Sequence, residues 1–316
     1  MSRECPDKSY SVVTIDEQQQ GCLSDYSVRL GQQCSNKNTR RFYEESARMM
    51  QEILTLEQLR DIRAVLLDGG PAAVLLSHLP TEDFGSCFPS TGNRPAGLSF
   101  RSDALLYGVA SIIGHPIGYS DEHSGDLVHE IANVSIGCPV YNSQHPDALN
   151  PHTDRSRYPE DLRPSVLLLL GMNNPEHLPT RFVLAGSVAR SLSESVRENL
   201  FRARYEFGLP SGRFQGLRSI LSSVGSGIEV TLPPEELPSD EESSSALAAF
   251  RSACIEQGEE VEVNAGKMLI LSNSRSVHFR DRNESPERWL RRMYVTVRYQ
   301  QLSRDGKVGL DDFVVA

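Results

Sequence analysis

The sequence predicts a mainly β fold with flanking helices, and two patterns support this prediction. Beyond about residue 114, short apolar runs alternate with Gly, Pro, Asn and Asp, which is typical of strands separated by turns. Between residues 41 and 66, apolar side chains recur every three or four positions, which predicts amphipathic helices ahead of the strands. The chain has 316 residues, of which 39% are hydrophobic and 23% charged. This ordinary globular composition excludes disorder of the whole chain.

The N-terminal part is expected to hold an arm followed by helices. Residues 1–40 are rich in Ser, Gln and Asn, and their apolar positions are sparse, so we expect a mobile arm or loose cover. Two amphipathic helices follow, and Thr55 and Gln58 have the spacing of a capping box at the start of the second. The apolar run 72–76 predicts a buried strand, and residues 103–113 predict a further helix.

The rest of the chain is expected to form one domain, residues 41–316, built mainly from strands. A helix is predicted over about residues 191–207, between two strands. The Ser-, Pro- and acid-rich stretch that follows indicates a lid or insertion at about residues 208–245. The predicted strands are residues 127–131, 166–170, 181–184, 261–263, 268–271 and 293–297.

Composition narrows the possible partners. Lys and Arg total 32 against 42 Asp and Glu, and the net charge of −10 disfavours nucleic acid and anionic membranes and favours a small or cationic ligand. No apolar run is long enough to span a membrane, and the first thirty residues have no signal-peptide core. Six scattered cysteines form neither a zinc ribbon nor a disulfide framework. We therefore expect a cytoplasmic protein that acts on a small molecule.

Two histidines and a carboxylate have the pattern of a metal site. His152 and Asp154 are two residues apart, so on a strand their side chains point to the same face. His278 follows the predicted strand 268–271 and is a candidate third ligand. Two histidines and one carboxylate form the facial triad of non-haem Fe(II) oxygenases, which leaves other coordination positions open.

Two segments of the chain resemble those of a known enzyme family. Arg292 lies fourteen residues after His278, within residues 289–295, Trp-Leu-Arg-Arg-Met-Tyr-Val. Residues 151–154 read Pro-His-Thr-Asp. Both segments resemble motifs of the Fe(II)/2-oxoglutarate-dependent dioxygenases of the clavaminate synthase-like (TauD-like) superfamily, and most of all its free amino-acid hydroxylases. The resemblance covers roughly residues 65–300.

This resemblance implies a double-stranded β-helix, or jelly-roll, core. It also implies that His152, Asp154 and His278 bind Fe(II) and form the catalytic centre, with 2-oxoglutarate and O2 as co-substrates. Arg292 would hold the distal carboxylate of 2-oxoglutarate, because a guanidinium can pair with a carboxylate through two hydrogen bonds. Thr180, twenty-eight residues after His152, would assist Arg292.

The implied activity is hydroxylation of an unactivated C–H bond of a free amino acid or amino-acid derivative in secondary metabolism, with release of succinate and CO2. Asp121 and Glu122 lie in the region that, by resemblance, binds the backbone of the substrate amino acid. Residues 227–240 lack the closely spaced aspartates that bind guanidinium in arginine hydroxylases, and offer Glu229, Glu235 and other acids elsewhere. We therefore expect an ammonium-bearing or neutral amino acid to be accepted ahead of arginine.

Two ligand positions depart from the family pattern. Asp154 stands where clavaminate synthase and the arginine hydroxylases carry Glu. Thr296, four residues after Arg292, stands where relatives often supply a second arginine. Arg298 and Arg275 are alternative partners for 2-oxoglutarate.

Several alternatives remain open at the level of sequence. His145 and Asp147 have the same spacing as the first two ligands, but Pro146 between them indicates a loop. The same site would also suit desaturation or cyclisation, since these depend on how the substrate is placed. A zinc-dependent hydrolase or isomerase uses similar ligands, and a jelly-roll protein that only binds its ligand is a third class.

Overall fold

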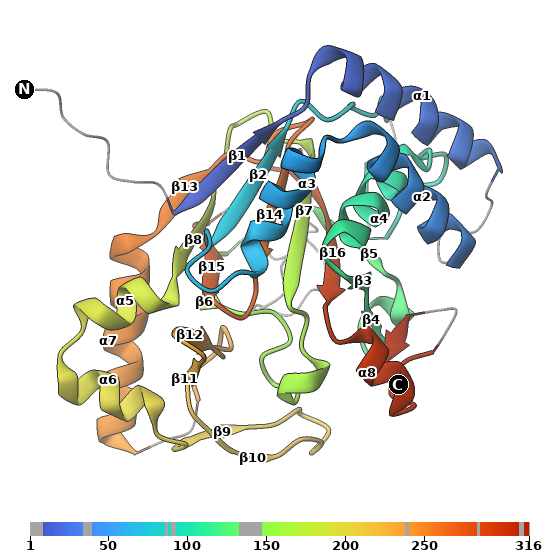
Figure 1. The fold of residues 1–316 in the computed structure, drawn as a ribbon. Coiled ribbons are helices and arrows are strands. Elements are labelled where there is room, and N and C mark those ends of the chain that lie inside the picture. The colour runs from blue at the N-terminus through green and yellow to red at the C-terminus, as the bar shows by residue number, and fades with distance from the viewer. Residues whose placement is uncertain are drawn as a thin grey trace, which may run out of the picture.

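The larger of two main sheets has seven strands in the order β1-β2-β14-β7-β16-β3, and β5 also pairs with β16 (Figure 1). The computed structural model describes residues 9–33, 40–85, 88–89, 93–132, 147–237, 240–282, 285–309 and 313–315. The strands of the larger sheet are β1 (Tyr10–Thr14), β2 (Ala73–Ser77), β3 (His115–Pro116), β5 (Val128–Ala132), β7 (Val166–Asn173), β14 (Met268–Ser272) and β16 (Trp289–Thr296).

The smaller sheet has four antiparallel strands in the order β13-β8-β15-β6. Side chains of both sheets, among them Leu169 and Leu290 of the larger and Phe279 of the smaller, line one cavity, so this cavity lies between the sheets. The strands of the smaller sheet are β6 (Leu149–His152), β8 (Thr180–Leu184), β13 (Glu259–Val261) and β15 (Ser276–Arg280). Three further pairs are β9 (Tyr205–Phe207) with β10 (Gly216–Arg218), β11 (Leu221–Val224) with β12 (Gly227–Val230), and β4 (Gly118–Tyr119) with β17 (Val314–Val315).

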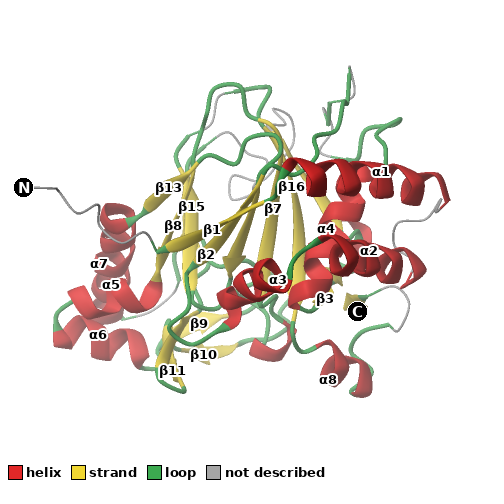
Figure 2. Cartoon of the chain, turned by 45° about the horizontal axis from the view of Figure 1, so that its top comes forward, coloured by secondary structure: helices red, strands yellow, loops and turns green. Residues whose placement is uncertain are grey.

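Helices lie in two groups on opposite sides of the molecule (Figure 2). The first group packs near the larger sheet, and the second near the smaller sheet. The helices of the first group are α1 (Glu17–Gln33), α2 (Arg40–Ile53), α3 (Leu56–Arg63) and α4 (Arg101–Ile113); those of the second are α5 (Ala185–Ser191), α6 (Glu194–Phe201) and α7 (Glu241–Gln257). Helix α8 (Tyr299–Arg304) and the 3-10 turns η1 (Ala64–Leu66), η2 (His123–Gly125) and η3 (Glu160–Leu162) complete the elements.

Most of the elements predicted from apolar patterns are present. The continuous apolar run of β7 is buried from Val166 to Met172, because one face of the sheet is covered by helices and the other faces the second sheet. The capping box of α3 is also confirmed. Thr55 Oγ1 accepts a hydrogen bond from the Gln58 N–H at 3.2 Å, and Gln58 Oε1 accepts one from the Thr55 N–H at 2.9 Å.

The N-terminal segment differs from the predicted mobile arm over residues 9–33. Strand β1 pairs in parallel with β2, and α1 buries Leu23 and Leu30 in the main core. The sequence pattern is weak here because α1 buries few apolar residues and β1 is an edge strand, whose place is fixed by backbone hydrogen bonds rather than by two buried faces.

The predicted insertion also contains more regular structure than expected. Within residues 208–245 lie β10, β11, β12 and the start of α7. The helix predicted over about 191–207 is present but shorter: α6 covers Glu194–Phe201, and residues 205–207 form β9 instead. Ser193 fixes its start by accepting a hydrogen bond from the Val196 N–H, and α5 is a separate helix that ends just before this cap.

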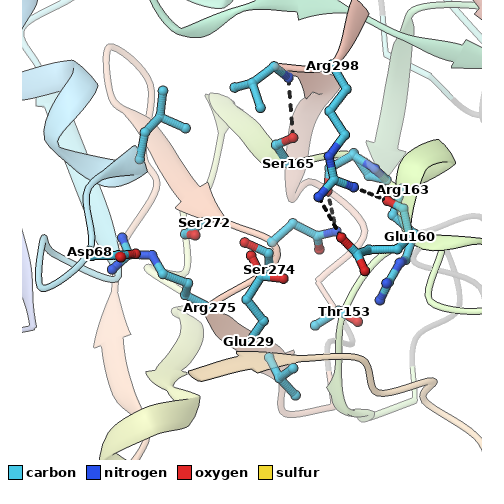
Figure 3. A pocket seen from close by; sticks show the side chains of 15 residues that line it. Asp68, Thr153, Glu160, Arg163, Ser165, Glu229, Ser272, Ser274, Arg275 and Arg298 are labelled. Carbon is cyan, nitrogen blue, oxygen red and sulfur yellow. Dashed lines mark hydrogen bonds and ion pairs between the residues drawn. The ribbon is translucent and has the colours of Figure 1, made fainter. Parts of the chain in front are cut away.

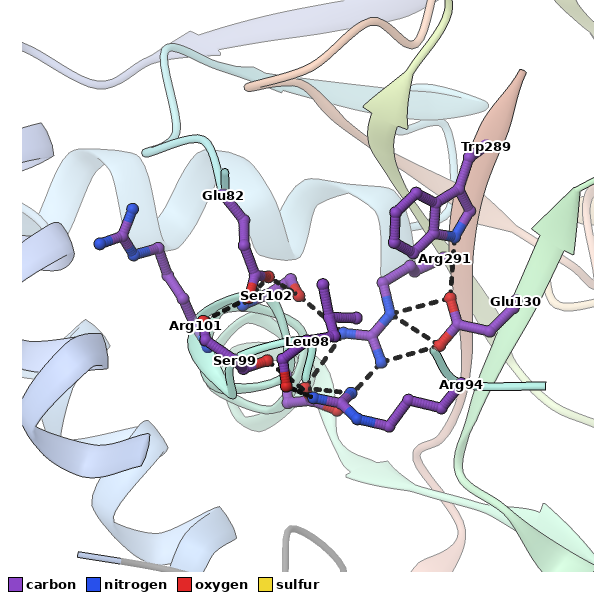
Figure 4. Close-up of polar contacts among 10 residues, drawn as sticks. Glu82, Arg94, Leu98, Ser99, Arg101, Ser102, Glu130, Trp289 and Arg291 are labelled. Carbon is purple, nitrogen blue, oxygen red and sulfur yellow. Dashed lines mark hydrogen bonds and ion pairs between the residues drawn. The ribbon is translucent and has the colours of Figure 1, made fainter. Parts of the chain in front are cut away.

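A buried ion network joins β16 and β5 of the larger sheet to α4 (Figure 4). Arg291, with no exposed surface, lies 3.0 Å from a carboxylate oxygen of Glu130 and 3.1 Å from one of Asp103. Trp289 Nε1 also donates to Glu130, at 2.8 Å. Arg291 and Trp289 lie on the face of β16 opposite Arg292, so the strand uses one face for stability and the other for the cavity.

Replacing Arg291 by Met is expected to lower the free energy of unfolding by about 3–5 kcal/mol, because two buried carboxylates lose their shared cation. Urea unfolding followed by circular dichroism measures this. Arg48→Ala is the control, since its pair with Glu45 is solvent-exposed and such pairs are worth less than about 1 kcal/mol. Equal losses in the two variants would contradict a special role for the buried network.

No helix among the described residues is both long enough and apolar enough to cross a membrane.

Candidate active site

The structure brings His152, Asp154 and His278 together, as the sequence predicts. His152 and His278 are direct cross-strand partners on β6 and β15, and their rings lie 4.2 Å apart. Asp154 lies two residues beyond the end of β6, with Oδ1 at 3.6 Å from His152 Nε2 and Oδ2 at 3.8 Å from His278 Nε2. One ligand atom from each residue falls within 4.8 Å of the other two.

Protonation of the three side chains also suits a divalent cation. His152 Nδ1 lies 2.8 Å from the carbonyl oxygen of Asn150, which sets Nδ1 as the N–H donor and leaves the Nε2 lone pair facing Asp154. Burial lowers the pKa of His278 to about 3, so its imidazole is neutral. Burial alone would raise the pKa of Asp154, but Arg292 and the two histidines hold it well below its ordinary value. Two imidazoles and one ionised carboxylate are a donor set that fits Fe(II).

Arg292 lies beside the triad, but its partners differ from those expected of a 2-oxoglutarate anchor. Its guanidinium donates to Asp154 Oδ2 at 3.2 Å and to Glu122 Oε1 at 2.8 Å. It also lies 3.0 Å from His129 Nδ1, whose other ring nitrogen faces the carbonyl oxygen of Asp126. Asp154 of the triad and Glu122 therefore both pair with this arginine.

Thr180 contacts a different arginine, Arg288, which the sequence analysis missed. Arg288 Nη2 donates to Thr180 Oγ1 at 3.2 Å, and both side chains line the cavity between the sheets together with His278 and Arg292. Arg288 and Arg292 are four residues apart in extended chain, which separates their Cα atoms by about 13 Å. Thr180 and Arg292 line the same cavity, but the Thr180 hydroxyl accepts from Arg288, so the role of Thr180 beside Arg292 stays a prediction.

The environment of Arg288 favours an anionic ligand. The side chain is 4% exposed, and its Nε is buried without a hydrogen-bond partner. Burial, together with neighbouring Arg280, lowers the pKa of Arg288 to about 10, so the guanidinium is still charged at neutral pH. A buried cation whose hydrogen bonds are incompletely satisfied is costly unless an anion binds to it. A sequence signal for Arg288 exists, because Arg288 lies directly before the strand that follows the distal histidine and four residues before Arg292.

Asp121 and Glu122 lie at the mouth of a second cavity of about 590 Å³ that also reaches the triad. Asp121 is engaged by Arg155 and by the Tyr158 hydroxyl at 2.6 Å. Burial alone would raise the pKa of Asp121, but these contacts lower it. Glu122 instead faces Arg292, so only Glu122 of the two acids contacts a residue that also touches the triad.

Two acids of the predicted lid pair with arginines, and a third lines a different cavity. Glu235 lines the second cavity but pairs with Arg157 at 2.5 Å, and Glu236 pairs with Arg251 at 2.7 Å. Glu229 lines a separate polar cavity of about 310 Å³ (Figure 3). None of these three acids offers the second cavity a carboxylate without an arginine partner.

The alternative 2-oxoglutarate partners named from sequence line the cavity of Figure 3 rather than the one between the sheets. Arg275 donates to the backbone carbonyls of Val65, Gly70 and Pro71. Arg298 pairs with Glu160 at 2.7 Å. Both guanidiniums are thus used in structural contacts.

The alternative metal pair falls partly outside the described residues, because His145 does. A second group of possible metal ligands does occur among the described residues, namely Glu122, His123 and His129. Burial and Arg292 lower the pKa of His129 well below its ordinary value. Arg292 already donates toward His129 Nδ1. We therefore interpret this group as hydrogen-bond partners of Arg292 rather than as metal ligands.

Comparisons with known proteins agree with this site. No protein-family model matches the chain. Three curated relatives are similar to it: enduracididine beta-hydroxylase of Streptomyces hygroscopicus (24% identical, 77% of this chain and 81% of the relative), L-ornithine/L-arginine 3-hydroxylase of Catenulispora acidiphila (23%, 67% and 71%) and clavaminate synthase 2 of Streptomyces clavuligerus (26%, 75% and 78%).

Solved structures are similar over nearly the whole chain. Asparagine oxygenase in complex with Fe(II), hydroxyasparagine and succinate has a TM-score of 0.83 at 19% identity, covering 96% of this chain and 98% of that one. The non-heme iron oxygenase OrfP with Fe, succinate and hydroxyarginine has a TM-score of 0.80 at 20% identity, covering 96% and 99%.

The sheet-rich fold, the His-Asp-His cluster and these relatives define a non-haem iron oxygenase that depends on 2-oxoglutarate. Within that class, the chain is a homologue of enduracididine beta-hydroxylase, L-ornithine/L-arginine 3-hydroxylase and clavaminate synthase 2, which confirms the resemblance found in the sequence. The alternatives of a zinc hydrolase and of a protein that only binds a ligand receive no support from these relatives.

Proposed function

We propose that the protein hydroxylates an unactivated C–H bond of a free amino acid or amino-acid derivative, while 2-oxoglutarate is converted to succinate and CO2. The observation that carries the substrate class is the Glu122–Arg292 pair, 2.8 Å apart and open to the cavity of about 590 Å³ beside the triad. An amino acid carries an ammonium and a carboxylate on adjacent atoms. A neighbouring carboxylate and guanidinium complement both groups.

In this proposal His152, Asp154 and His278 hold Fe(II). The iron supplies O2 activation when it is bound. The protein's part is to keep the His278 imidazole neutral by burial, to orient the His152 ring through the Asn150 carbonyl, and to keep the Asp154 carboxylate ionised beside Arg292. The cavity between the sheets then leads from the triad toward Thr180.

Arg288 with Thr180 is the better anchor for the distal carboxylate of 2-oxoglutarate. Among the described residues Arg288 has no carboxylate partner, whereas Arg292 pairs with Glu122 and Asp154. Arg292 and Glu122 line the second cavity, which Arg288 does not, so we assign Arg292 to the substrate carboxylate and Glu122 to the ammonium group. Asp121 supports this site indirectly, because it holds Arg155, which also lies 3.4 Å from Glu122.

The fold expected of such an enzyme is the jelly-roll, with the two sheets as its halves and residues 41–316 as one catalytic domain. Residues 208–245 are its lid, since Arg157 ties Glu235 over the second cavity. Residues 9–33 extend the larger sheet and act as a cover rather than a free arm.

Amino-acid-dependent succinate release is expected when the purified protein is supplied with Fe(II) and 2-oxoglutarate. Lysine, ornithine, a neutral aliphatic amino acid, asparagine, arginine and a carrier-bound aminoacyl thioester are compared, with mass spectrometry of each product. Ammonium-bearing or neutral side chains are expected ahead of arginine, because residues 227–240 lack the closely spaced aspartates that bind guanidinium in arginine hydroxylases. Turnover with arginine alone would contradict the lid argument, and turnover with the thioester alone would contradict a free amino acid.

The same product analysis separates hydroxylation from the other outcomes. Gain of one oxygen atom supports hydroxylation. Loss of two hydrogens indicates desaturation or cyclisation and contradicts it.

A further inference from the structure

Asn273 connects the two chain segments that supply the metal ligands. We propose that Asn273 is a positioning residue: its side-chain amide fixes Asp154 relative to His278 and thereby sets the metal affinity of the triad. The inference rests on the proposed Fe(II) site. Asn273 lies in the turn between β14 and β15, five residues before His278, and is 3% exposed.

Three hydrogen bonds carry this inference. Asn273 Oδ1 accepts from the Asp154 N–H at 2.8 Å, and Asn273 Nδ2 donates to the Asp154 carbonyl oxygen at 3.0 Å. The same Nδ2 donates to the carbonyl oxygen of Pro164 at 2.9 Å. One side chain therefore satisfies both backbone groups of the metal-binding carboxylate residue, as a neighbouring strand would.

The strand pairing around the triad explains why such a link is needed. β6 ends at His152, so Asp154 lies outside its ladder. The pairing of β6 with β15 consists of His278 with His152 and Arg280 with Leu149, with an irregularity between them. Two pairs over an irregular register fix His152 against His278 but leave Asp154 without backbone partners from β15. Asn273 supplies them.

Thr153 anchors the same segment from the opposite side. Its N–H donates to the Leu232 carbonyl oxygen at 2.7 Å, and its hydroxyl accepts from the Leu232 N–H at 3.1 Å. The residue between the two ligands is thus fixed to the segment that follows β12. With Asn273 on Asp154, the backbone can neither slide along β6 nor rotate away from His278.

Asparagine suits this position for chemical reasons. An amide offers one acceptor and two donors, and the three bonds use all of them. Aspartate keeps the acceptor but presents a charged oxygen to two carbonyl oxygens. Alanine leaves the buried N–H and carbonyl groups of Asp154 unpaired, and such groups are costly.

Cobalt binding to the metal-free protein tests the proposal. Isothermal titration calorimetry gives the Co(II) affinity, and the visible spectrum of bound Co(II) reports the ligand geometry, neither of which needs turnover. Asn273→Ala and Asn273→Asp are expected to weaken Co(II) binding about ten- to hundredfold, the usual effect of losing a group that orients a metal ligand. Ser274→Ala, in the same turn but without a contact to Asp154, is the matched control and should bind as the wild type does.

Measurements are made well below the unfolding midpoint of each variant, so that lost stability is not mistaken for lost affinity. Wild-type affinity and spectrum in folded Asn273→Ala would overturn the proposal. If that variant does not fold, wild-type binding by Asn273→Asp overturns it instead. His278→Ala keeps the two proposals apart, because undiminished Co(II) binding in that variant would show that the triad itself is misassigned.

Discussion

Replacing His278 by Ala is expected to abolish both metal binding and turnover, with succinate release below about one thousandth of the wild-type rate. Only three protein ligands hold the ion in the proposed site, and burial keeps this imidazole neutral and ready to donate its lone pair. Fe(II) content after anaerobic loading and succinate release are the two measurements. His152→Ala should behave in the same way, because His152 and His278 are direct partners across strands β6 and β15.

His177→Ala is the control for these two variants. His177 lies on the surface, where it pairs with Glu262 at 2.8 Å, and its side chain is 65% exposed. Its loss should change neither iron content nor turnover. Full activity in His278→Ala or His152→Ala would instead move the metal to another pair, with His145 and Asp147 as the candidates of equal spacing.

The triad could be predicted from sequence because its first two ligands follow a short-range rule and the resemblance to a known family joins His278 to them. His152 and Asp154 are two residues apart, and His278 follows a strand that is recognisable as an unbroken apolar run. Unbroken apolar runs predict buried strands, and β7 and β14 agree with this prediction. The strand over residues 293–297 follows from its apolar run as well, whereas Arg292 is implied by the resemblance.

Which arginine meets Thr180 could not be predicted, since it depends on the path of the chain between β15 and β16. Counting fourteen residues from His278 selects Arg292, but the strand places Arg288 next to Thr180 and turns Arg292 toward Glu122. The role of Asn273 could not be predicted from the sequence either, for a different reason. A single polar residue after a strand is an ordinary turn residue until its partners, more than a hundred residues away in sequence, are known.

Replacing Arg288 by Ala is expected to raise the apparent KM for 2-oxoglutarate about tenfold or more. Charge-assisted hydrogen bonds are worth about 1.5–3 kcal/mol, and each 1.4 kcal/mol is a factor of ten in affinity. The buried, incompletely satisfied guanidinium beside Thr180 has the charge and donors to hold a carboxylate there. Thr180→Val should have the same direction and a smaller size, because it removes one neutral hydroxyl.

Arg292→Lys is the comparison that decides between the two arginines. It keeps the positive charge near Asp154 but loses the fork that reaches Glu122 and Asp154 together, so the KM for the amino acid should rise while that for 2-oxoglutarate changes little. Steady-state kinetics with each co-substrate varied in turn give both constants. If the KM for 2-oxoglutarate rises in Arg292→Lys and is unchanged in Arg288→Ala, the assignment from sequence spacing is right and Arg288 is a structural cation. If instead the KM for 2-oxoglutarate rises in Arg288→Ala and is unchanged in Arg292→Lys, the co-substrate binds at Thr180 and Arg288, and Arg292 with Glu122 binds the amino acid.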